Sequence, residues 1–93
     1  MNPLVEVSFR LVGQSFPFDH GYALYGALSR IAPDLHGMER FALLLVRGVP
    51  VGDGTIRLTS ESRLRLRIAA DQLASVMMLA GRAIRVGGHD VCT

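Results

Sequence analysis

The stretch that decides the fold runs from Asp19 to Pro33 and reads DHGYALYGALSRIAP. Asp19 is a residue type that caps the first free amides of a helix, and proline disfavours the α region at the residue before it. The pattern therefore predicts a helix from about His20 to Ile31. Its apolar side chains recur at helical spacing and are expected to face a core, namely Ala23, Leu24, Ala27, Leu28 and Ile31.

A second stripe on this helix is polar. Tyr22, Tyr25 and Ser29 are spaced three and four residues apart, so they share one side of the helix. His20 comes just before this stripe, and His36 follows the helix directly. Two imidazoles and two phenols thus bracket one short element, which a purely structural helix does not need.

Length and composition limit the class of protein. The 93 residues suffice for one domain with one core. The single cysteine, Cys92, cannot form an internal disulfide, and the first residues lack the pattern of a secretion signal, so we expect a cytoplasmic protein. The longest apolar run, Phe41 to Val46, is far shorter than the ~20 residues that cross a bilayer, so we expect no membrane partner.

The cations are unusual, because all ten basic residues are arginine and none is lysine. Arginine binds phosphate bidentately and stacks on bases. Codon preference in a GC-rich genome is an alternative cause of this bias. The placement of the arginines therefore has to distinguish RNA binding from codon preference.

Strand patterns surround the helix. Leu4 to Val12 alternates apolar and polar residues and predicts a half-buried strand. Phe41 to Val46 is apolar throughout, which is typical of a central strand covered on both faces. Gly48 to Thr55 predicts a hairpin excursion. Arg63 to Ile68 predicts a strand that turns Leu64, Leu66 and Ile68 inward and its three arginines outward.

The remaining segments complete the order of elements. Ala69 to Ala80 predicts a second helix with Leu73, Val76, Met77 and Ala80 facing inward. Arg82 to Val86 predicts a last strand, and Gly13 to Phe18 a connection whose two phenylalanines pack at the start of the first helix. The order βαββαβ, with its hairpin excursion, predicts an α+β, ferredoxin-like domain over residues 1–93: a four-stranded antiparallel sheet with both helices on one face.

Such a fold leaves one sheet face open. RNA-recognition domains of this architecture place stacking aromatic residues there, whereas this sequence places arginines and aliphatic residues. The uniformly apolar run from Phe41 to Val46 suggests that a neighbouring domain, another subunit or a second copy in a homo-oligomer covers the open face.

Several motifs follow one another in a specific order. They are HGYxLYxALSR from His20, LH from Leu35, RG from Arg47, LTxxSRLRLR from Leu58, LAG from Leu79 and RVGGH from Arg85. Together they resemble the CRISPR repeat-processing endoribonucleases, the sixth Cas protein family of the repeat-associated mysterious protein superfamily. The likeness covers essentially the whole chain and is strongest to the Myxan subtype.

The resemblance implies CRISPR RNA maturation. Members of the family cut the repeat RNA of pre-crRNA without a metal or another cofactor, by attack of a ribose 2′-hydroxyl that leaves a 2′,3′-cyclic phosphate. They have two ferredoxin-like domains, and this chain resembles the N-terminal one. The implied partners are the repeat RNA, the second domain or another subunit, and a Cascade-type effector complex.

The resemblance and the chemistry of the residues suggest catalytic roles. A histidine in the Leu-His turn after the first helix is commonly catalytic in the family, and this position is His36. His20 stands at a helix start, where the macrodipole favours a neutral ring that can act as a base, although a structural role is equally compatible with the position. Tyr22 can donate a hydrogen bond to phosphate, with a packing role as the alternative, and either Arg40 or Arg47 can supply a cation for the developing charge.

RNA contacts are expected from one tyrosine and a set of arginines, namely Tyr25, Arg30, Arg47, Arg63, Arg65 and Arg67. The alternatives are a packing role for Tyr25 and a solvated edge for the arginine row. We interpret His89 as structural. The histidines and the cysteine have no ligand spacing that predicts a metal site, and the glycine pairs lack the lysine of a nucleotide-binding loop.

Two classes of function therefore remain. One is the RNA-binding and catalytic half of a repeat-processing nuclease. The other is a non-catalytic ferredoxin-like module, either an RNA-binding subunit of a ribonucleoprotein or an oligomerisation domain. Convergence of His36, the two tyrosines and an arginine on one exposed cleft favours the nuclease.

Overall fold

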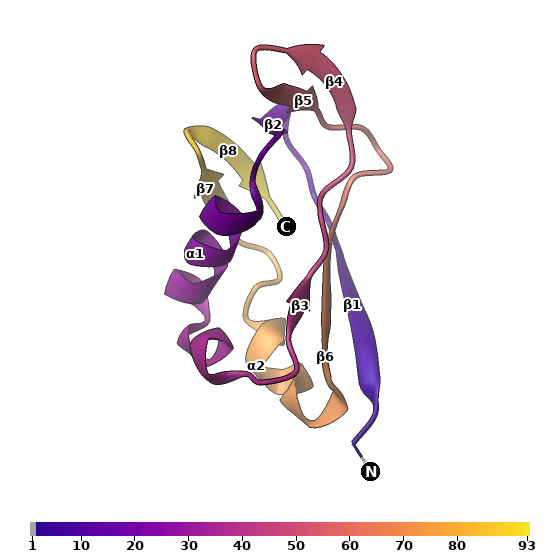
Figure 1. Ribbon diagram of the computed structural model, residues 1–93, viewed down its shortest axis with the longest axis vertical. Helices are drawn as coiled ribbons and strands as arrows, with labels where there is room; N and C mark the ends of the chain where they lie inside the picture. Colours follow the sequence, from indigo (N-terminus) through magenta and orange to yellow (C-terminus); the bar gives the residue numbers. More distant parts are fainter. Residues whose placement is uncertain (1) are drawn as a thin grey trace.

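The computed structural model describes residues 2–93 and is elongated, with the helices beside long strands (Figure 1). Its strands are β1 (Leu4–Arg10), β2 (Ser15–Pro17), β3 (Ala42–Leu43), β4 (Val49–Gly52), β5 (Thr55–Arg57), β6 (Arg63–Ala69), β7 (Ala83–Val86) and β8 (His89–Cys92). Its helices are α1 (Gly21–Ile31) and α2 (Leu73–Met77), with the 3-10 helices η1 (Pro33–Gly37) and η2 (Ala70–Gln72). Over residues 2–93, none of the helices has the length and apolar character to cross a membrane.

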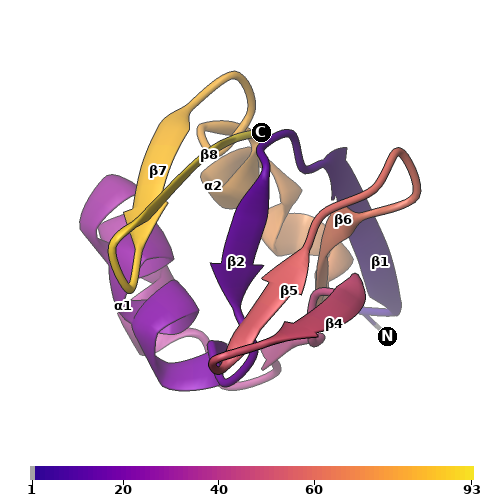
Figure 2. The ribbon, with the colours of Figure 1, turned by 90° about the horizontal axis from the view of Figure 1, so that it is seen from above.

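Strand β6 organises the structure. It lies between β1 and β3 in a three-stranded antiparallel sheet, and its register with β1 runs from Leu4 opposite Ala69 to Arg10 opposite Arg63. Strands β2, β5 and β4 form a second antiparallel sheet, and β7 pairs with β8 in a hairpin. Figure 2 shows the second sheet and this hairpin from above.

The core lies between β6 and the helices. Leu64, Leu66 and Ile68 alternate with the arginines of β6 and are fully buried, which confirms the predicted inward face. Both helices lie on this side of the sheet (Figure 1), and Leu24 and Leu28 of α1 join the same core. The period of two in β6 and the helical period in α1 thus bury one continuous apolar surface.

The α+β class and the antiparallel pairing are confirmed, but the strands divide into sheets of three, three and two instead of one four-stranded sheet. The strand ladders are interrupted at a turn just before β6. There Ser62 Oγ accepts a hydrogen bond from the amide of Thr59 and donates one to the carbonyl of Arg47, so a side chain takes the place of a strand partner for these two backbone groups. Two backbone bonds extend the pairing of the two larger sheets toward each other: the bond from Leu11 to Ser62 continues the β1–β6 pair, and the bond from Leu58 to Gln14 continues the β2–β5 pair. The ferredoxin-like assignment stays a prediction.

The prediction of a covered central strand over Phe41 to Val46 was wrong. Only Ala42 and Leu43 form a strand, and β3 lies at the sheet edge. The chain turns away from β6 after Leu44, so Leu45 is 64% exposed while Val46 is buried. An apolar run cannot distinguish a central strand from a segment whose residues divide between core and surface.

Helix α1 lies where the sequence predicts it, with two corrections of detail. Its N-cap residue is His20, and no side chain caps its first amides, so the capping role of Asp19 was wrong. Ala23 is exposed, whereas Ser29, expected on the polar stripe, is buried without a partner for its hydroxyl. The core face of α1 is therefore rotated toward Ser29.

The second helix is shorter than predicted. Residues 70–72 form a 3-10 turn, and α2 ends at Met77, after which the amides of Leu79 and Ala80 donate to the carbonyls three residues earlier. Val76 and Leu79, spaced by three as in this tighter winding, are buried, while Leu73, Met77 and Ala80, which were expected to face inward, are exposed. Strands β2 and β8 fall in segments that were expected to be connections. Strand β2 pairs with β5, which is distant in the sequence, and β8 pairs with β7 across a tight turn at Gly87 and Gly88.

Candidate functional site

His36 lies in η1, just beyond the end of α1, and its side chain is exposed. Pro33 begins this 3-10 turn, and Leu35, which is 1% exposed, anchors it in the core. The ring of Tyr25 meets the His36 ring edge-on, with centroids 5.7 Å apart at 85°. The ring of Phe41 is tilted by 50° against that of Tyr25, with the two ring centroids also 5.7 Å apart. The three rings form one aromatic cluster at the C-terminal end of α1.

Tyr25 also contacts the backbone of the turn. Its hydroxyl donates a long hydrogen bond of 3.4 Å to the carbonyl of Leu35, the residue before His36. The half-buried ring and this bond both act on the segment that carries the imidazole. Tyr25 thus lies where it can fix the orientation of His36.

His20 has a different environment. It is 2% exposed, its Nδ1 lies 2.7 Å from the carbonyl of Pro17, and its Nε2 accepts the amide of Val46 at 2.9 Å. Accepting this amide requires a neutral ring with its proton on Nδ1. Both ring nitrogens of His20 are therefore engaged. The third histidine, His89 of β8, forms a 2.8 Å hydrogen bond with Ser15 of β2 and so links these two strands, which is consistent with a structural role.

Tyr22 and Arg30 lie on the exposed side of α1. Tyr22, one turn before Tyr25, is 94% exposed. Arg30 is exposed, and its guanidinium lies beside Gly26, where a Cβ would be 3.7 Å from Nη1. Helix α1 therefore presents the phenol of Tyr22 and the guanidinium of Arg30 to solvent.

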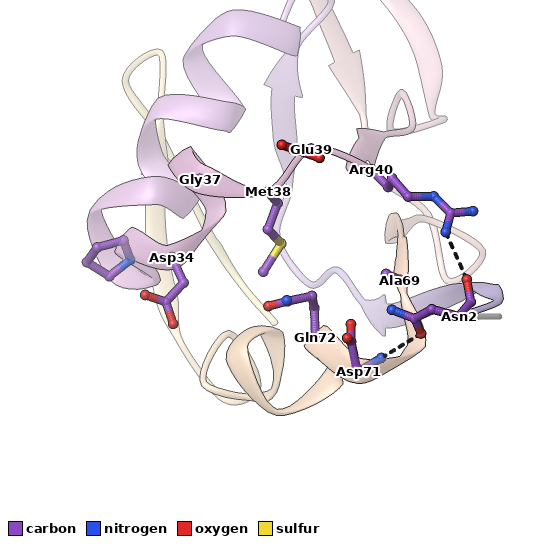
Figure 3. A pocket seen from close by; sticks show the side chains of 10 residues that line it. Asn2, Asp34, Gly37, Met38, Glu39, Arg40, Ala69, Asp71 and Gln72 are labelled. Carbon is purple, nitrogen blue, oxygen red and sulfur yellow. Dashed lines mark hydrogen bonds between the residues drawn. The ribbon is translucent and has the colours of Figure 1, made fainter.

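Arg40 lines a cleft of about 640 Å³ next to the η1 turn (Figure 3). Its Nη1 donates a 2.9 Å hydrogen bond to the carbonyl of Asn2. Asp34 and Gly37, which lie close to His36 on either side in the sequence, also line this cleft, together with Glu39 and Asp71. Three carboxylates thus accompany the single arginine, so the cleft itself is poorly suited to an anion.

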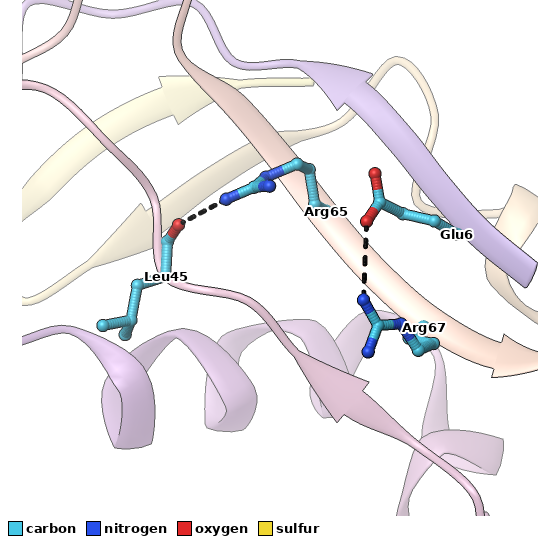
Figure 4. A network of polar contacts seen from close by, with 4 residues as sticks. All are labelled: Glu6, Leu45, Arg65 and Arg67. Carbon is cyan, nitrogen blue, oxygen red and sulfur yellow. Dashed lines mark hydrogen bonds and ion pairs between the residues drawn. The ribbon is translucent and has the colours of Figure 1, made fainter.

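The three arginines of β6 have unequal surroundings. Arg67 lies 4.0 Å from Glu6 of β1, and Arg65 donates to the carbonyl of Leu45 at 3.3 Å (Figure 4). Arg63 donates to the carbonyls of Ser60 and Ser62. Among these three, Arg67 alone has a carboxylate partner within residues 2–93, so the row is not one uniform cationic surface.

Arg47 and Arg65 line a second cavity, a groove of about 620 Å³ beside the β4–β5 hairpin. Its other lining residues are mainly apolar and include Phe18, Leu44, Leu45, Val46, Pro50 and Ile56. Phe18 is 61% exposed, which corrects the prediction that both phenylalanines pack at the start of α1, since Phe16 alone is buried against His20. No local motif identifies this groove, because four separate segments build it.

The predicted site residues thus divide into two regions. His36 and Tyr25 come together at one end of α1, with Arg40 in the adjoining cleft and Tyr22 one turn along the helix. Arg47 and Arg65 lie together in the groove, which reaches His20 at the other end of α1. In residues 2–93, no three histidine, cysteine, aspartate or glutamate side chains gather as metal ligands would.

Comparison with known proteins agrees with the motifs. The family described as Cas6 Crispr matches residues 5–92. The CRISPR-associated endonuclease Cas6 of Myxococcus xanthus (strain DK1622) is 30% identical over 85 residues, which cover 91% of this chain. The chain spans only 36% of the length of that relative. The predicted family is confirmed, and the chain belongs to the Cas6 family of CRISPR-associated proteins.

Proposed function

We propose that this chain is the domain bearing the catalytic histidine of an endoribonuclease that cuts the repeat RNA of pre-crRNA. The name of the Myxococcus relative supports a CRISPR-associated endonuclease activity. The observation that carries the proposal is the state of His36. Within residues 2–93 it is the histidine whose ring nitrogens have no hydrogen-bond partner, while its ring is exposed and held edge-on by Tyr25.

The proposed reaction is an internal transesterification. The ribose 2′-oxygen forms a bond to the adjacent phosphorus as the bond from phosphorus to the 5′-oxygen breaks. The 2′-hydroxyl gives its proton to a base, and the departing 5′-oxygen receives one from an acid. An imidazole suits either transfer because its unperturbed titration lies near working pH, and His36 is the group that we assign to one of them.

The charge on the crowded phosphate needs a cation or hydrogen-bond donors. We assign this charge to Arg40, four residues after His36, whose guanidinium must then leave both the carbonyl of Asn2 and the carboxylate-lined cleft to reach the phosphate. The hydroxyl of Tyr22 is free to donate to a phosphate oxygen from the exposed side of α1. No step in this scheme uses a metal ion, so the reaction is proposed to be metal-independent.

The same proposal includes the architecture and the partners. We take the chain as the N-terminal of two ferredoxin-like domains in a cytoplasmic protein, with the second domain, repeat RNA and a Cascade-type complex as partners. The short match to the longer Myxococcus relative supports a larger natural protein. The strands of the two larger sheets, joined through β1–β2 and β5–β6, support a ferredoxin-like topology.

A modified substrate tests the chemistry. In the complete natural protein, its own repeat RNA with a single 2′-deoxy nucleotide at the cleavage position should bind normally and remain uncut. The unmodified RNA should be cut equally well with and without EDTA and should end in a 2′,3′-cyclic phosphate. Cleavage of the deoxy substrate, or failure to cut the unmodified RNA after chelation, would contradict the proposed reaction.

The non-catalytic module has one observation in its favour. Leu45 is 64% exposed beside the edge strand β3, so an apolar surface at the sheet edge is available for burial by RNA or protein. Such a module predicts that His36 has no effect on repeat cleavage. The two functions therefore predict different cleavage rates for one variant, His36→Ala.

A further inference from the structure

The groove beside the β4–β5 hairpin has a fixed floor. The hydrogen bond from Val46 to His20 holds the segment before the hairpin against the start of α1. Gly48 approaches β5 so closely that a Cβ there would lie 2.5 Å from the carbonyl oxygen of Arg57. Ile56, 4% exposed, closes the floor from β5. The groove is therefore held in shape by the backbone and one buried imidazole.

The rim of the groove combines apolar surface with positive charge. Phe18 and Leu45, 61% and 64% exposed, contribute exposed apolar surface to its lining. Arg65 is held in place by its bond to the carbonyl of Leu45, and Arg47 follows Val46 at the edge. A preorganised guanidinium loses less freedom when it binds a ligand than a free one does.

The charge of the groove selects the sign of its ligand. Among residues 2–93, its lining contains two arginines and no aspartate or glutamate. The cleft beside η1, of nearly the same volume, has three carboxylates around Arg40. Two cations beside apolar surface fit a ligand that carries both an anionic group and a flat apolar ring.

We propose that this groove binds an unpaired nucleotide of single-stranded RNA, with the base against Phe18 and the phosphate between Arg47 and Arg65. An unpaired base offers its ring face to an aromatic side chain, whereas a duplex keeps its bases stacked inside. The inference rests on the proposed function, because it takes RNA as the ligand. It adds a binding subsite that is separate from His36.

The two sites lie at opposite ends of α1. The groove includes His20, the N-cap of the helix, and His36 follows its C-terminal end. The 11 residues of α1 separate them by about 16 Å of helix. Substitutions in the groove are therefore expected to change RNA affinity without changing the chemical step.

A tryptophan reporter tests stacking at Phe18 directly. The chain has no tryptophan, so Phe18→Trp in the 93-residue chain provides a single fluorophore at the groove. A single-stranded RNA of about ten nucleotides, within the usual span of one binding site, is the probe. We expect its addition to quench the tryptophan, and the same RNA annealed to its complement to quench far less.

Affinity measurements with matched controls test the contributions of Phe18 and Arg65 to RNA binding. Phe18→Ala should weaken binding of the single strand by about 5- to 150-fold, while Leu73→Ala, an exposed apolar residue of α2, should not. Arg65→Gln should lower the slope of log affinity against log salt by about 0.7. Arg85 of β7 forms an exposed ion pair with Asp90 of β8 and does not line the groove, so Arg85→Gln should leave the slope unchanged.

Several results would overturn the proposal. They are RNA binding without quenching at position 18, no binding of the single strand by the wild-type chain at low salt, and quenching that appears on self-association without RNA. The last result assigns the groove to a second copy. Failure of the proposed function is a separate result, because the groove can bind and quench while the natural protein leaves its repeat uncut.

Discussion

The amide of Val46 donates a 2.9 Å hydrogen bond to Nε2 of His20, a residue 26 positions earlier in the chain. The other ring nitrogen lies 2.7 Å from the carbonyl of Pro17. One buried imidazole thus joins the end of β2, the start of α1 and the segment that leads into β4. This placement favours a structural role for His20 over that of a base, since a base needs a free nitrogen.

His20→Ala is therefore expected to destabilise the fold. The substitution leaves the buried amide of Val46 without a partner, and such a loss typically costs ~1–3 kcal/mol in the free energy of unfolding. Urea denaturation followed by circular dichroism measures it. An alanine variant of wild-type stability that no longer cleaves RNA would instead assign His20 to catalysis.

Gly48→Ala tests the close approach of the hairpin to its neighbour. The added Cβ would lie 2.5 Å from the carbonyl oxygen of Arg57, so the backbone must move and the melting temperature should fall clearly. Gly21→Ala is the matched control, because nothing lies within 4 Å of its Cβ position. Equal melting temperatures for the two variants would show that the groove floor is not rigid.

Tyr25 is expected to act through His36. Tyr25→Phe keeps the ring beside the imidazole and removes only a long hydrogen bond of 3.4 Å, so cleavage by the complete protein should fall little. Tyr25→Ala removes the ring and should lower kcat more than it changes KM. A large rise in KM in both variants would favour direct RNA contact by the hydroxyl.

The arginine row of β6 is expected to contribute to RNA affinity through charge. Replacing Arg63, Arg65 and Arg67 together by alanine in the complete protein should lower the salt slope by about 0.7 for each phosphate that the row neutralises. The single Arg67→Ala variant should change the slope least, because Glu6 already lies beside Arg67. An unchanged slope in the triple variant would identify the row as a solvated edge.

These predictions depend on features that the sequence revealed to different degrees. The helix at Gly21–Ile31 and the strand at Arg63–Ala69 were predicted closely, because in both the apolar period matches the geometry of the element. The run from Phe41 to Val46 was misread, since an unbroken apolar segment contains no period that shows which residues are buried. The apolar face of the second helix was misplaced because no local signal marks the end of α2 at Met77 and the tighter turns that follow it.

The candidate site was likewise only partly predictable from the sequence. The motif around His36 is local, and its exposure follows from Pro33 and the buried Leu35, which fix the short turn that carries it. The hydrogen bonds of His20 depend on Val46, and the groove depends on Phe18, Arg47 and Arg65 from separate segments. Contacts over such separations are set by the tertiary fold, which a single sequence does not display.

The central claim is that His36 moves a proton during repeat cleavage. Single-turnover cleavage of the natural repeat RNA by the complete protein tests it most directly, with wild type compared to His36→Ala. We expect the variant to cleave ~10²–10⁴-fold more slowly and to bind the RNA with nearly unchanged affinity. Cleavage by His36→Ala at the wild-type rate would contradict the claim and leave this domain as an RNA-binding module.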